Sequence, residues 1–386
     1  MDNLRIGLVT ECYYPTLGGI QEHVRHLRNY LGRQGIDVTV LTGSPIAPVA
    51  GSFPADAEDH VVRLGKSRRF RTGGTFTQAT LGPIIAARFL RQLRRGRFDL
   101  LNIHGPCDLG LATLAMSLYR GPKVLTLHSC FPDARWRRRV SPYYRWVFRR
   151  AASVIAVSRA TAQSMGRYAD FRSTIIPNGV DVDYWSAAPS PLYQRPGFRN
   201  LVYVGRLEER NGPDLAIAAF ARVAARLPDV RLLMAGDGPM RSALENSVPL
   251  PFRDRVEFLG PVYDERPALL ASSSLFLLPA RAVGFSILVL EAFAARLPVV
   301  ALPALGTDCA GSHWTNVLLS QNESPGAYAT AILNALASDN QQRIENGLHI
   351  AREHDWSGMG GRILNVFEQV VAAKKGLSVA PDHLAA

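Results

Sequence analysis

The sequence predicts an α/β protein built from two Rossmann-like domains that face each other across a cleft. Short β-branched runs alternate with helical stretches, and this alternation is typical of βα units that form a parallel sheet. A proline-rich stretch at residues 187–197 interrupts the alternation, which then begins again. A length of 386 residues fits two domains, because a domain commonly has about 100–200 residues. Ligands of such sheets bind beyond the carboxyl ends of the strands, so we expect a site in the cleft.

The first predicted domain covers residues 1–186 and opens with a strand followed by a helix. Apolar residues recur at helical spacing from Ile20 to Leu31 and give that helix one apolar stripe, and Gly35 ends it. The strands of this domain are expected at residues 5–10, 38–42, 100–104, 124–128, 154–158 and 174–177.

The second predicted domain, residues 198–355, repeats the pattern after the linker at residues 187–197. Its strands are expected at residues 201–204, 230–235, 256–259, 275–278 and 299–301. Apolar residues at helical spacing from Ile363 to Val370 predict a closing helix within residues 356–386. Only the tail after residue 376 has the composition of a frayed end.

The composition excludes several classes of protein. Hydrophobic residues make up 47% and charged residues 20% of the chain, which is the balance of a folded protein. Four cysteines lie far apart without a CxxC pair, so the sequence predicts neither disulfides nor a metal site. No apolar run reaches the roughly 18 residues of a membrane span, and the N-terminus enters a strand without the regions of a signal peptide. We therefore expect an intracellular protein that does not span a membrane.

A strong positive charge indicates a polyanionic partner. The chain has 44 lysines and arginines against 32 aspartates and glutamates, a formal net charge of +12. One basic cluster has a helical pattern, with an apolar stripe from Ile85 to Leu93 and arginines opposite it. These arginines are Arg88, Arg91, Arg94 and Arg95. A basic amphipathic helix of this kind favours binding to an anionic membrane surface.

A second group of arginines, between residues 135 and 150, is interleaved with aromatic residues such as Trp136 and Trp146. Aromatic rings in such a mixture are typical of membrane interfaces. Nucleic acid is the rival polyanion, because the basic and aromatic mixture alone does not exclude it. An ordinary solvated helix face is the third interpretation. We favour the membrane and expect no nucleic-acid partner.

Four loops at strand ends are candidates for ligand binding. Gly18 and Gly19 precede the first helix, where the backbone can approach a ligand closely and the helix N–H groups favour an anion; a plain tight turn is the alternative. Arg206 follows the strand at residues 201–204, and its guanidinium suits a diphosphate because it pairs bidentately with phosphate oxygens. The other two loops are residues 236–239 and residues 283–286.

In this order and at these intervals, the loops resemble those of the large retaining glycosyltransferase family 4, which has the GT-B fold and includes phosphatidylinositol mannosyltransferases and glucosyl-diacylglycerol synthases. The resemblance covers nearly the whole chain and implies that the C-terminal helix crosses back to the first domain. The matching segments are residues 18–21 with 23–24, 126–129, 177–181, 204–207, 236–239, 258–260, 284–292, 298–301 and 354–357.

The resemblance implies a site for a nucleotide-diphosphate sugar donor, such as GDP-mannose or a UDP-sugar, and no other cofactor. Gly18 and Gly19 would lie against the diphosphate, which Arg206 would neutralise. Glu291 would accept the ribose hydroxyls. His128 matches the family's active-site histidine near the sugar, so His128 and Arg206 are the catalytic candidates. The remaining donor-binding candidates are Asn211, Gly284 and Phe285. His104, at the preceding strand end, is expected to be an ordinary buried histidine.

The chain departs from the family's pattern at three positions. Seven residues separate Val283 from Glu291, and Val283 stands where the family has a second glutamate that holds the donor sugar. Asn211 stands where the family has a lysine near the diphosphate, with Arg210 as a candidate substitute. Arg296 stands where the family has a glycine.

We therefore expect a retaining glycosyltransferase, peripheral on the cytoplasmic face of the membrane, that moves a hexosyl group from a nucleotide-diphosphate sugar to a lipid or lipid-linked acceptor. The alternative, favoured by Val283 and Asn211, is a non-catalytic GT-B protein with a degraded donor site that binds a partner. Hydrolysis or epimerisation of a nucleotide sugar is disfavoured, because the cleft segments carry no added carboxylate pair.

Overall fold

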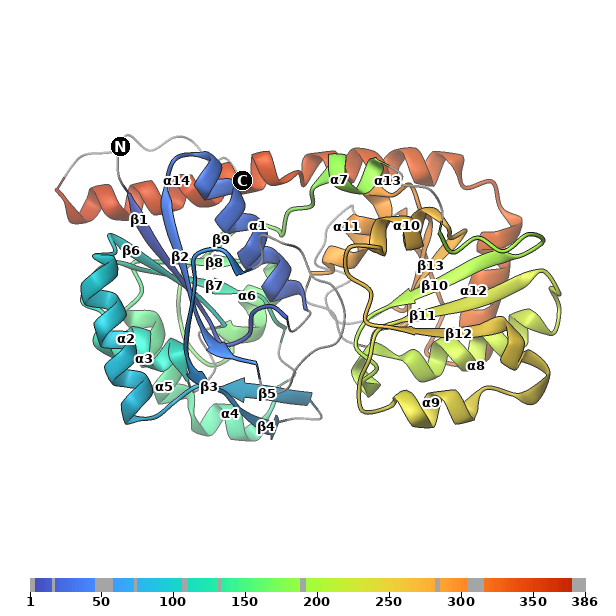
Figure 1. The fold of residues 1–386 in the computed structure, drawn as a ribbon, viewed down its shortest axis with the longest axis horizontal. Helices are drawn as coiled ribbons and strands as arrows, with labels where there is room; N and C mark the ends of the chain where they lie inside the picture. The colour runs from blue at the N-terminus through green and yellow to red at the C-terminus, as the bar shows by residue number, and fades with distance from the viewer. Residues whose placement is uncertain are drawn as a thin grey trace.

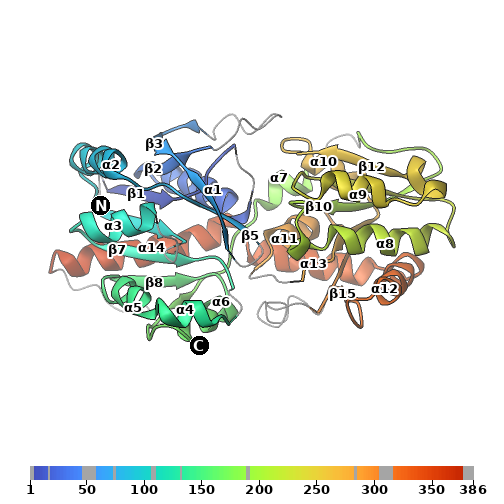
Figure 2. The ribbon, with the colours of Figure 1, turned by 90° about the horizontal axis from the view of Figure 1, so that it is seen from below.

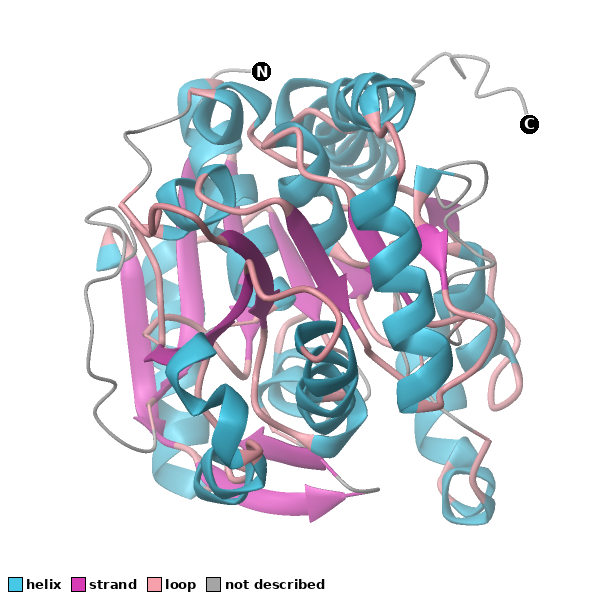
Figure 3. Cartoon of the chain, turned by 90° about the vertical axis from the view of Figure 1, so that its right-hand side faces the viewer, coloured by secondary structure: helices cyan, strands magenta, loops and turns pink. Residues whose placement is uncertain are grey.

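The computed structural model describes residues 4–15, 18–45, 58–72, 75–105, 110–130, 133–187, 192–281, 285–303 and 316–376, with the backbone alone for residues 69–72 and 75–77. Two parallel sheets lie side by side, the first on the left and the second on the right of Figure 1. Helices flank the strands on both sides, as Figure 3 shows from the end of the molecule. This arrangement confirms the predicted α/β fold with two Rossmann-like halves.

The first sheet has seven parallel strands in the order β3-β2-β1-β6-β7-β8-β9. The strands are β1 (Arg5–Thr10), β2 (Asp37–Ser44), β3 (Val61–Lys66), β6 (Leu100–His104), β7 (Lys123–Leu127), β8 (Ser153–Ala156) and β9 (Thr174–Ile175). The helices of this half are α1 (Gly19–Arg33), α2 (Pro83–Gly96), α3 (Leu111–Leu118), α4 (Arg135–Arg139), α5 (Ser141–Arg149), α6 (Arg159–Gly166) and α7 (Val182–Ser186). An antiparallel hairpin, β4 (Arg68–Thr72) with β5 (Thr75–Ala79), lies outside the sheet.

The second sheet has six parallel strands in the order β12-β11-β10-β13-β14-β15. They are β10 (Arg199–Val204), β11 (Val230–Ala235), β12 (Val256–Gly260), β13 (Leu275–Leu278), β14 (Val299–Ala301) and β15 (Leu318–Leu319). The helices are α8 (Pro213–Ala224), α9 (Arg241–Ser247), α10 (Arg266–Ala271), α11 (Ile287–Ala294), α12 (Pro325–Ala337) and α13 (Gln341–Glu353), with 3₁₀ turns at Glu209–Asn211 and Leu250–Arg255.

Burial on both faces of the sheet explains why its strands are apolar throughout. Every residue of β11 is buried, and successive side chains point to opposite faces of a strand. Leu232 accordingly packs in the core on one side of the second sheet, with Phe220 of α8, and Leu233 packs in the core on the other side, with Phe293 of α11. Continuous apolar runs are typical of parallel sheets covered on both faces.

The C-terminal helix α14 (Trp356–Lys374) returns to the first half of the chain, as the fold class predicts. It runs along the top of Figure 1 and beneath the first sheet in Figure 2. Gly360 makes close packing on α1 feasible, because a Cβ at this position would lie 2.5 Å from the ring of Tyr30. Trp356, at the helix start, is buried in the same core as β1 and α1.

The sequence-predicted strands are all present, with ends that match or differ by at most two residues, whereas β3, the β4–β5 hairpin and β15 were missed. The missed strands lack a strong apolar signal, since β3 is interrupted by Arg63 and Gly65 and β15 has two residues. Helix α7 packs against α10 and α11, with Trp185 in a core of the second half. The chain thus contacts the second half before it reaches the proline-rich stretch.

Candidate active site

The first turn of α1 faces α11 across the boundary between the two halves. Gly19 opens α1 directly after the loop that follows β1, and a Cβ at Gly19 would lie 3.6 Å from Cδ1 of Ile287. Ile287 is the first residue of α11, the helix that carries Glu291. The predicted diphosphate loop and the predicted ribose-binding carboxylate therefore lie on elements that meet.

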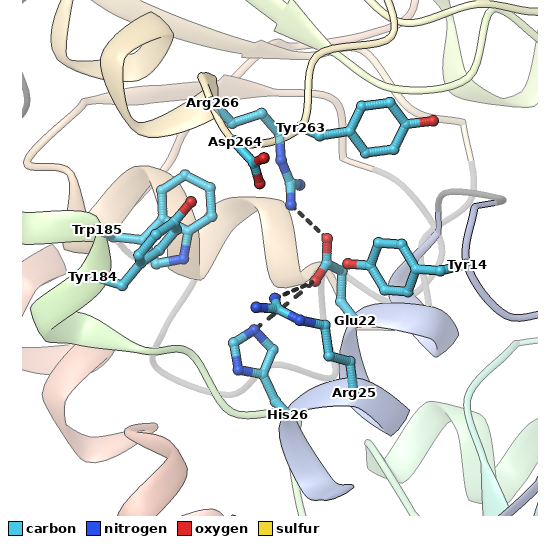
Figure 4. A pocket seen from close by; sticks show the side chains of 9 residues that line it. All are labelled: Tyr14, Glu22, Arg25, His26, Tyr184, Trp185, Tyr263, Asp264 and Arg266. Atoms are coloured by element: carbon cyan, nitrogen blue, oxygen red, sulfur yellow. Dashed lines mark hydrogen bonds and ion pairs between the residues drawn. The ribbon is translucent and has the colours of Figure 1, made fainter. Parts of the chain in front are cut away.

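Arg266 joins the two halves through a pair of buried carboxylates, as the close-up shows for its bond to Glu22 (Figure 4). Its Nη2 donates to Oε1 of Glu22 in α1 at 2.5 Å, and its Nη1 lies 3.3 Å from Oε2 of Glu291 in α11. The side chains of Arg266, Glu22 and Glu291 are only 12%, 7% and 4% exposed. One guanidinium thus serves two carboxylates that come from opposite sides of the boundary.

The two carboxylates that share Arg266 have different pKa values. Burial alone would raise the pKa of Glu22, but the charges of Arg266 and His26 outweigh burial and hold this pKa below its usual value. Burial raises the pKa of Glu291 to about 7, although Arg266 opposes the shift. Since two anions share one cation, the second carboxylate ionises only with difficulty. Glu291 therefore changes its protonation near neutral pH.

A small pocket beside this ion pair contains side chains from both halves (Figure 4). The lining residues are Tyr14, Glu22, Arg25, His26, Tyr184, Trp185, Tyr263, Asp264 and Arg266. The sequence analysis selected none of them. Both Glu22 and Arg266 lie just beyond the carboxyl end of a parallel strand, and that position is the signal that would have singled them out.

The loop after β10 presents two arginines around one carboxylate. Arg206 Nη1 lies 3.3 Å from Oε1 of Glu208, and Arg210 Nε lies 3.8 Å from Oε2 of the same side chain. Two guanidiniums and one carboxylate leave a net positive charge, which favours an anion. Asn211 does not add to this charge, because its side-chain amide donates to the Arg206 carbonyl at 2.8 Å and so fixes the loop.

Two glycines, Gly236 and Gly238, pack directly against the backbone of the loop that carries Arg206. A Cβ at Gly236 would lie 1.9 Å from the Gly205 carbonyl oxygen, and one at Gly238 would lie 2.6 Å from the Leu207 carbonyl oxygen. Gly236 also has a φ of 141°, which side chains rarely adopt. Residues 236–239 therefore support the Arg206 loop.

His128 follows β7, and His104 ends the neighbouring strand β6. Nδ1 of His104 lies 2.9 Å from Nε2 of His128, and the His23 ring from α1 lies 4.7 Å from the His128 ring, centroid to centroid. Burial lowers the pKa of His104 and of His128 well below the usual value. Both imidazoles are therefore neutral at pH 7, and His104, predicted to be an ordinary buried histidine, is a hydrogen-bond partner of His128.

The remaining donor-binding candidates and departures from the family pattern flank the sequence of α11. Val283 and Gly284 are outside the described residues. Phe285 stacks on the ring of His354 with a centroid distance of 5.8 Å. Arg296, directly after α11, has a φ of 59°, a left-handed conformation in which glycine is favoured.

Helix α2 lies far from these groups, at the outer left edge of Figure 1. Phe89 is the buried residue of this helix. The side chains of Arg88, Arg91, Arg94 and Arg95 are exposed, as are Leu81 and Ile84 near the N-terminal end. Within the described part of the chain, none of the helices combines the length and the apolar character of a membrane span.

Comparison with known proteins identifies the family. The model of glycosyltransferase family 4 matches residues 17–184, and that of glycosyl transferases group 1 matches residues 198–338. A phosphatidyl-myo-inositol mannosyltransferase of Propionibacterium freudenreichii is 30% identical, over 94% of each chain. The enzyme of the same name from Mycolicibacterium smegmatis is also 30% identical, over 96% of this chain and 95% of its own.

A crystal structure of HepE from Anabaena in complex with UDP-glucose superimposes with a TM-score of 0.76 at 21% identity, over 94% of this chain and 99% of that one. This likeness shows the GT-B fold, in agreement with the two facing sheets and the returning helix α14. By its sequence and by its architecture, the chain belongs to glycosyltransferase family 4.

Proposed function

We propose that the protein transfers a hexosyl group from a nucleotide-diphosphate sugar to a lipid or lipid-linked acceptor, with retention of the anomeric configuration. The observation that carries the proposal is the pair Arg206 and Arg210 around the single carboxylate of Glu208. Its excess positive charge lies beyond the carboxyl end of β10, where such sheets bind ligands. A leaving diphosphate is the group that this charge would stabilise best.

In this proposal, Gly18 and Gly19 approach the diphosphate and Glu291 accepts the ribose hydroxyls. Arg266 occupies one side of the Glu291 carboxylate, but a carboxylate has about four acceptor positions, so others remain for hydroxyl donors. Arg266 would thus orient Glu291 toward the nucleotide. Because Arg266 also binds Glu22, nucleotide binding would be sensitive to the relative position of the two halves.

His128 is proposed to contact the donor sugar as a neutral hydrogen-bonding group. No protein nucleophile is required if the leaving phosphate assists the incoming hydroxyl, so that catalysis depends on positioning and charge. The excess of lysine and arginine and the exposed arginines of α2 support docking on an anionic membrane surface, on the cytoplasmic face, where the lipid acceptor lies.

Calorimetry with GDP, UDP and their sugar derivatives tests the donor site. We expect Arg206→Ala and Glu291→Ala each to weaken nucleotide binding roughly tenfold or more, because a hydrogen bond to a charged group contributes about 1.5–3 kcal/mol. Arg241→Ala is the matched control, since Arg241 pairs with Glu245 on the surface of α9. Unchanged affinity in both site variants would refute the assignment. A transfer assay with vesicles that contain phosphatidylinositol then identifies the acceptor class.

The second candidate function is nucleotide binding or partner binding without transfer. It is favoured by Asn211, whose amide is committed to the Arg206 carbonyl and supplies no cation. This alternative predicts no turnover with any donor that binds.

A further inference from the structure

Three histidines of the first half converge at the carboxyl edge of its sheet. His104 ends β6, His128 follows the adjacent strand β7, and His23 lies in the first turns of α1. One ring nitrogen from each of the three lies within 4.8 Å of one another. His23 and His104 are 1% and 2% exposed, and His128 is half-buried. The cluster is therefore largely shielded from bulk water, and His128 is its most exposed member.

The hydrogen bond of His23 uses one ring nitrogen and leaves the lone pair of the other, Nε2, without a partner among the described residues. Its Nδ1 lies 2.9 Å from Oδ1 of the buried Asn178. An amide oxygen only accepts hydrogen bonds, so Nδ1 carries the proton and Nε2 of the neutral ring is an acceptor. Among the described residues, Nε2 of His23 has no hydrogen-bond partner. Second-partner bonds of this kind orient the histidine ligands of metal ions.

The pair His104 and His128 is also incompletely satisfied. One hydrogen atom links Nδ1 of His104 to Nε2 of His128, and within the described part of the chain Nε2 of His104 has no partner. Leaving a buried polar atom unpaired is unfavourable, and here two such atoms occur in one cluster. Neutral imidazole is the form of histidine that binds metal ions.

We propose that His23, His104 and His128 bind one divalent transition-metal ion of the Zn²⁺ class. Three imidazoles with a fourth position open to water or a ligand is a common arrangement for Zn²⁺. Ligand nitrogens 2.0–2.1 Å from a tetrahedral ion are about 3.3 Å apart, and one ring nitrogen of each histidine lies within 4.8 Å of the other two. Binding of the ion would draw the three rings closer together.

The ion would also affect transfer, and this consequence alone depends on the proposed function. His128 is the group proposed to contact the donor sugar, and coordination would fix the orientation of its ring and occupy one of its two ring nitrogens. Zn²⁺ would therefore inhibit transfer, and a chelator would restore it.

The test measures binding of Zn²⁺ to the full-length protein after treatment with EDTA, by calorimetry and by the visible absorption of bound Co²⁺. We expect one equivalent to bind, with a tetrahedral Co²⁺ spectrum. His23→Gln, His104→Gln and His128→Gln should each weaken binding at least about tenfold, whereas His349→Gln should not, since His349 is 74% exposed on α13. Far-ultraviolet circular dichroism confirms that each variant is folded.

Absence of Zn²⁺ binding to the wild-type protein would overturn the proposal, as would binding that survives all three cluster substitutions. If a variant unfolds, the rise in melting temperature of the wild-type protein with added Zn²⁺, and its absence with Mg²⁺, provides the second measurement. A protein that binds Zn²⁺ through the cluster but transfers no sugar refutes the proposed function alone. A protein that transfers sugar but binds no Zn²⁺ refutes the metal site alone.

Discussion

Replacing Arg266 by methionine removes the guanidinium that Glu22 and Glu291 share. Both carboxylates are almost fully buried, and Arg266 lies within hydrogen-bond distance of each. Removal of one partner of a buried ion pair commonly costs about 3–5 kcal/mol, because the other charge stays buried without compensation. We expect a loss of unfolding free energy in this range at pH 8.

The loss should shrink as the pH falls. In the wild-type protein the pKa of Glu291 is raised to about 7, whereas that of Glu22 is lowered by Arg266. Without Arg266, the pKa of Glu291 would rise further, because Arg266 is the cation that opposes the effect of burial. A carboxyl group whose pKa is higher in the folded than in the unfolded protein leaves the stability intact below its unfolded pKa. As the pH rises from the unfolded to the folded pKa, the free energy of unfolding falls by up to about 1.4 kcal/mol per pH unit for each such group. The variant should therefore lose stability from about pH 5 to pH 8 more steeply than the wild type.

Urea unfolding followed by tryptophan fluorescence measures both effects, because Arg266 lies 5.3 Å from the ring centre of Trp185. Arg241→Met is the matched control. Its exposed pair with Glu245 should contribute less than about 1 kcal/mol at any pH. Glu291→Gln should be mild, because Arg266 then still has Glu22. A loss below about 1 kcal/mol for Arg266→Met, or a loss equal at pH 5 and pH 8, would refute the reasoning.

Three further predictions concern the departures from the family pattern and the basic surface. Arg296→Gly should stabilise the protein by about 0.5–1 kcal/mol, because glycine relieves the left-handed strain; Arg296→Ala, which keeps a Cβ, should give no such gain in the same urea titration. Replacing the α2 arginines at positions 88, 91 and 95 by glutamine should reduce sedimentation with anionic vesicles more than a triple change at positions 222, 226 and 241 of the second half. Raised salt should release the wild-type protein, since such attraction is screened over about 8 Å at physiological ionic strength, and equal binding to neutral vesicles would contradict this. In a specialised enzyme, Val283→Glu with Asn211→Lys should raise neither nucleotide-sugar affinity nor turnover; a double variant that gains affinity absent from the wild type would show that the donor site has decayed.

Local sequence determined the elements of the fold. Strands such as β11 and β13 were predicted with their observed ends, because burial on both faces requires continuous apolar runs that end at polar or glycine residues. The α1 helix was predicted from its apolar stripe, and Gly35 follows it with a φ of 76°. The hairpin of β4 and β5 escaped prediction, since its stability depends on pairing between two strands.

The residues of the candidate site also fall into two groups, those that the sequence predicted and those that only the tertiary structure revealed. Gly19 and Arg206 were found because each stands at a helix start or strand end, which local pattern reveals, and Glu291 was found through the resemblance to the family. Glu22 and Arg266 were not found, although their ion pair joins the two halves across 244 positions of the chain. The convergence of the three histidines on one point was equally hidden, because it depends on β6 and β7 being neighbours and on α1 crossing their ends. The spacing of apolar residues shows which face of a helix or strand is buried. Which side chains that face contacts depends on how elements that are distant in the sequence pack together in the folded protein.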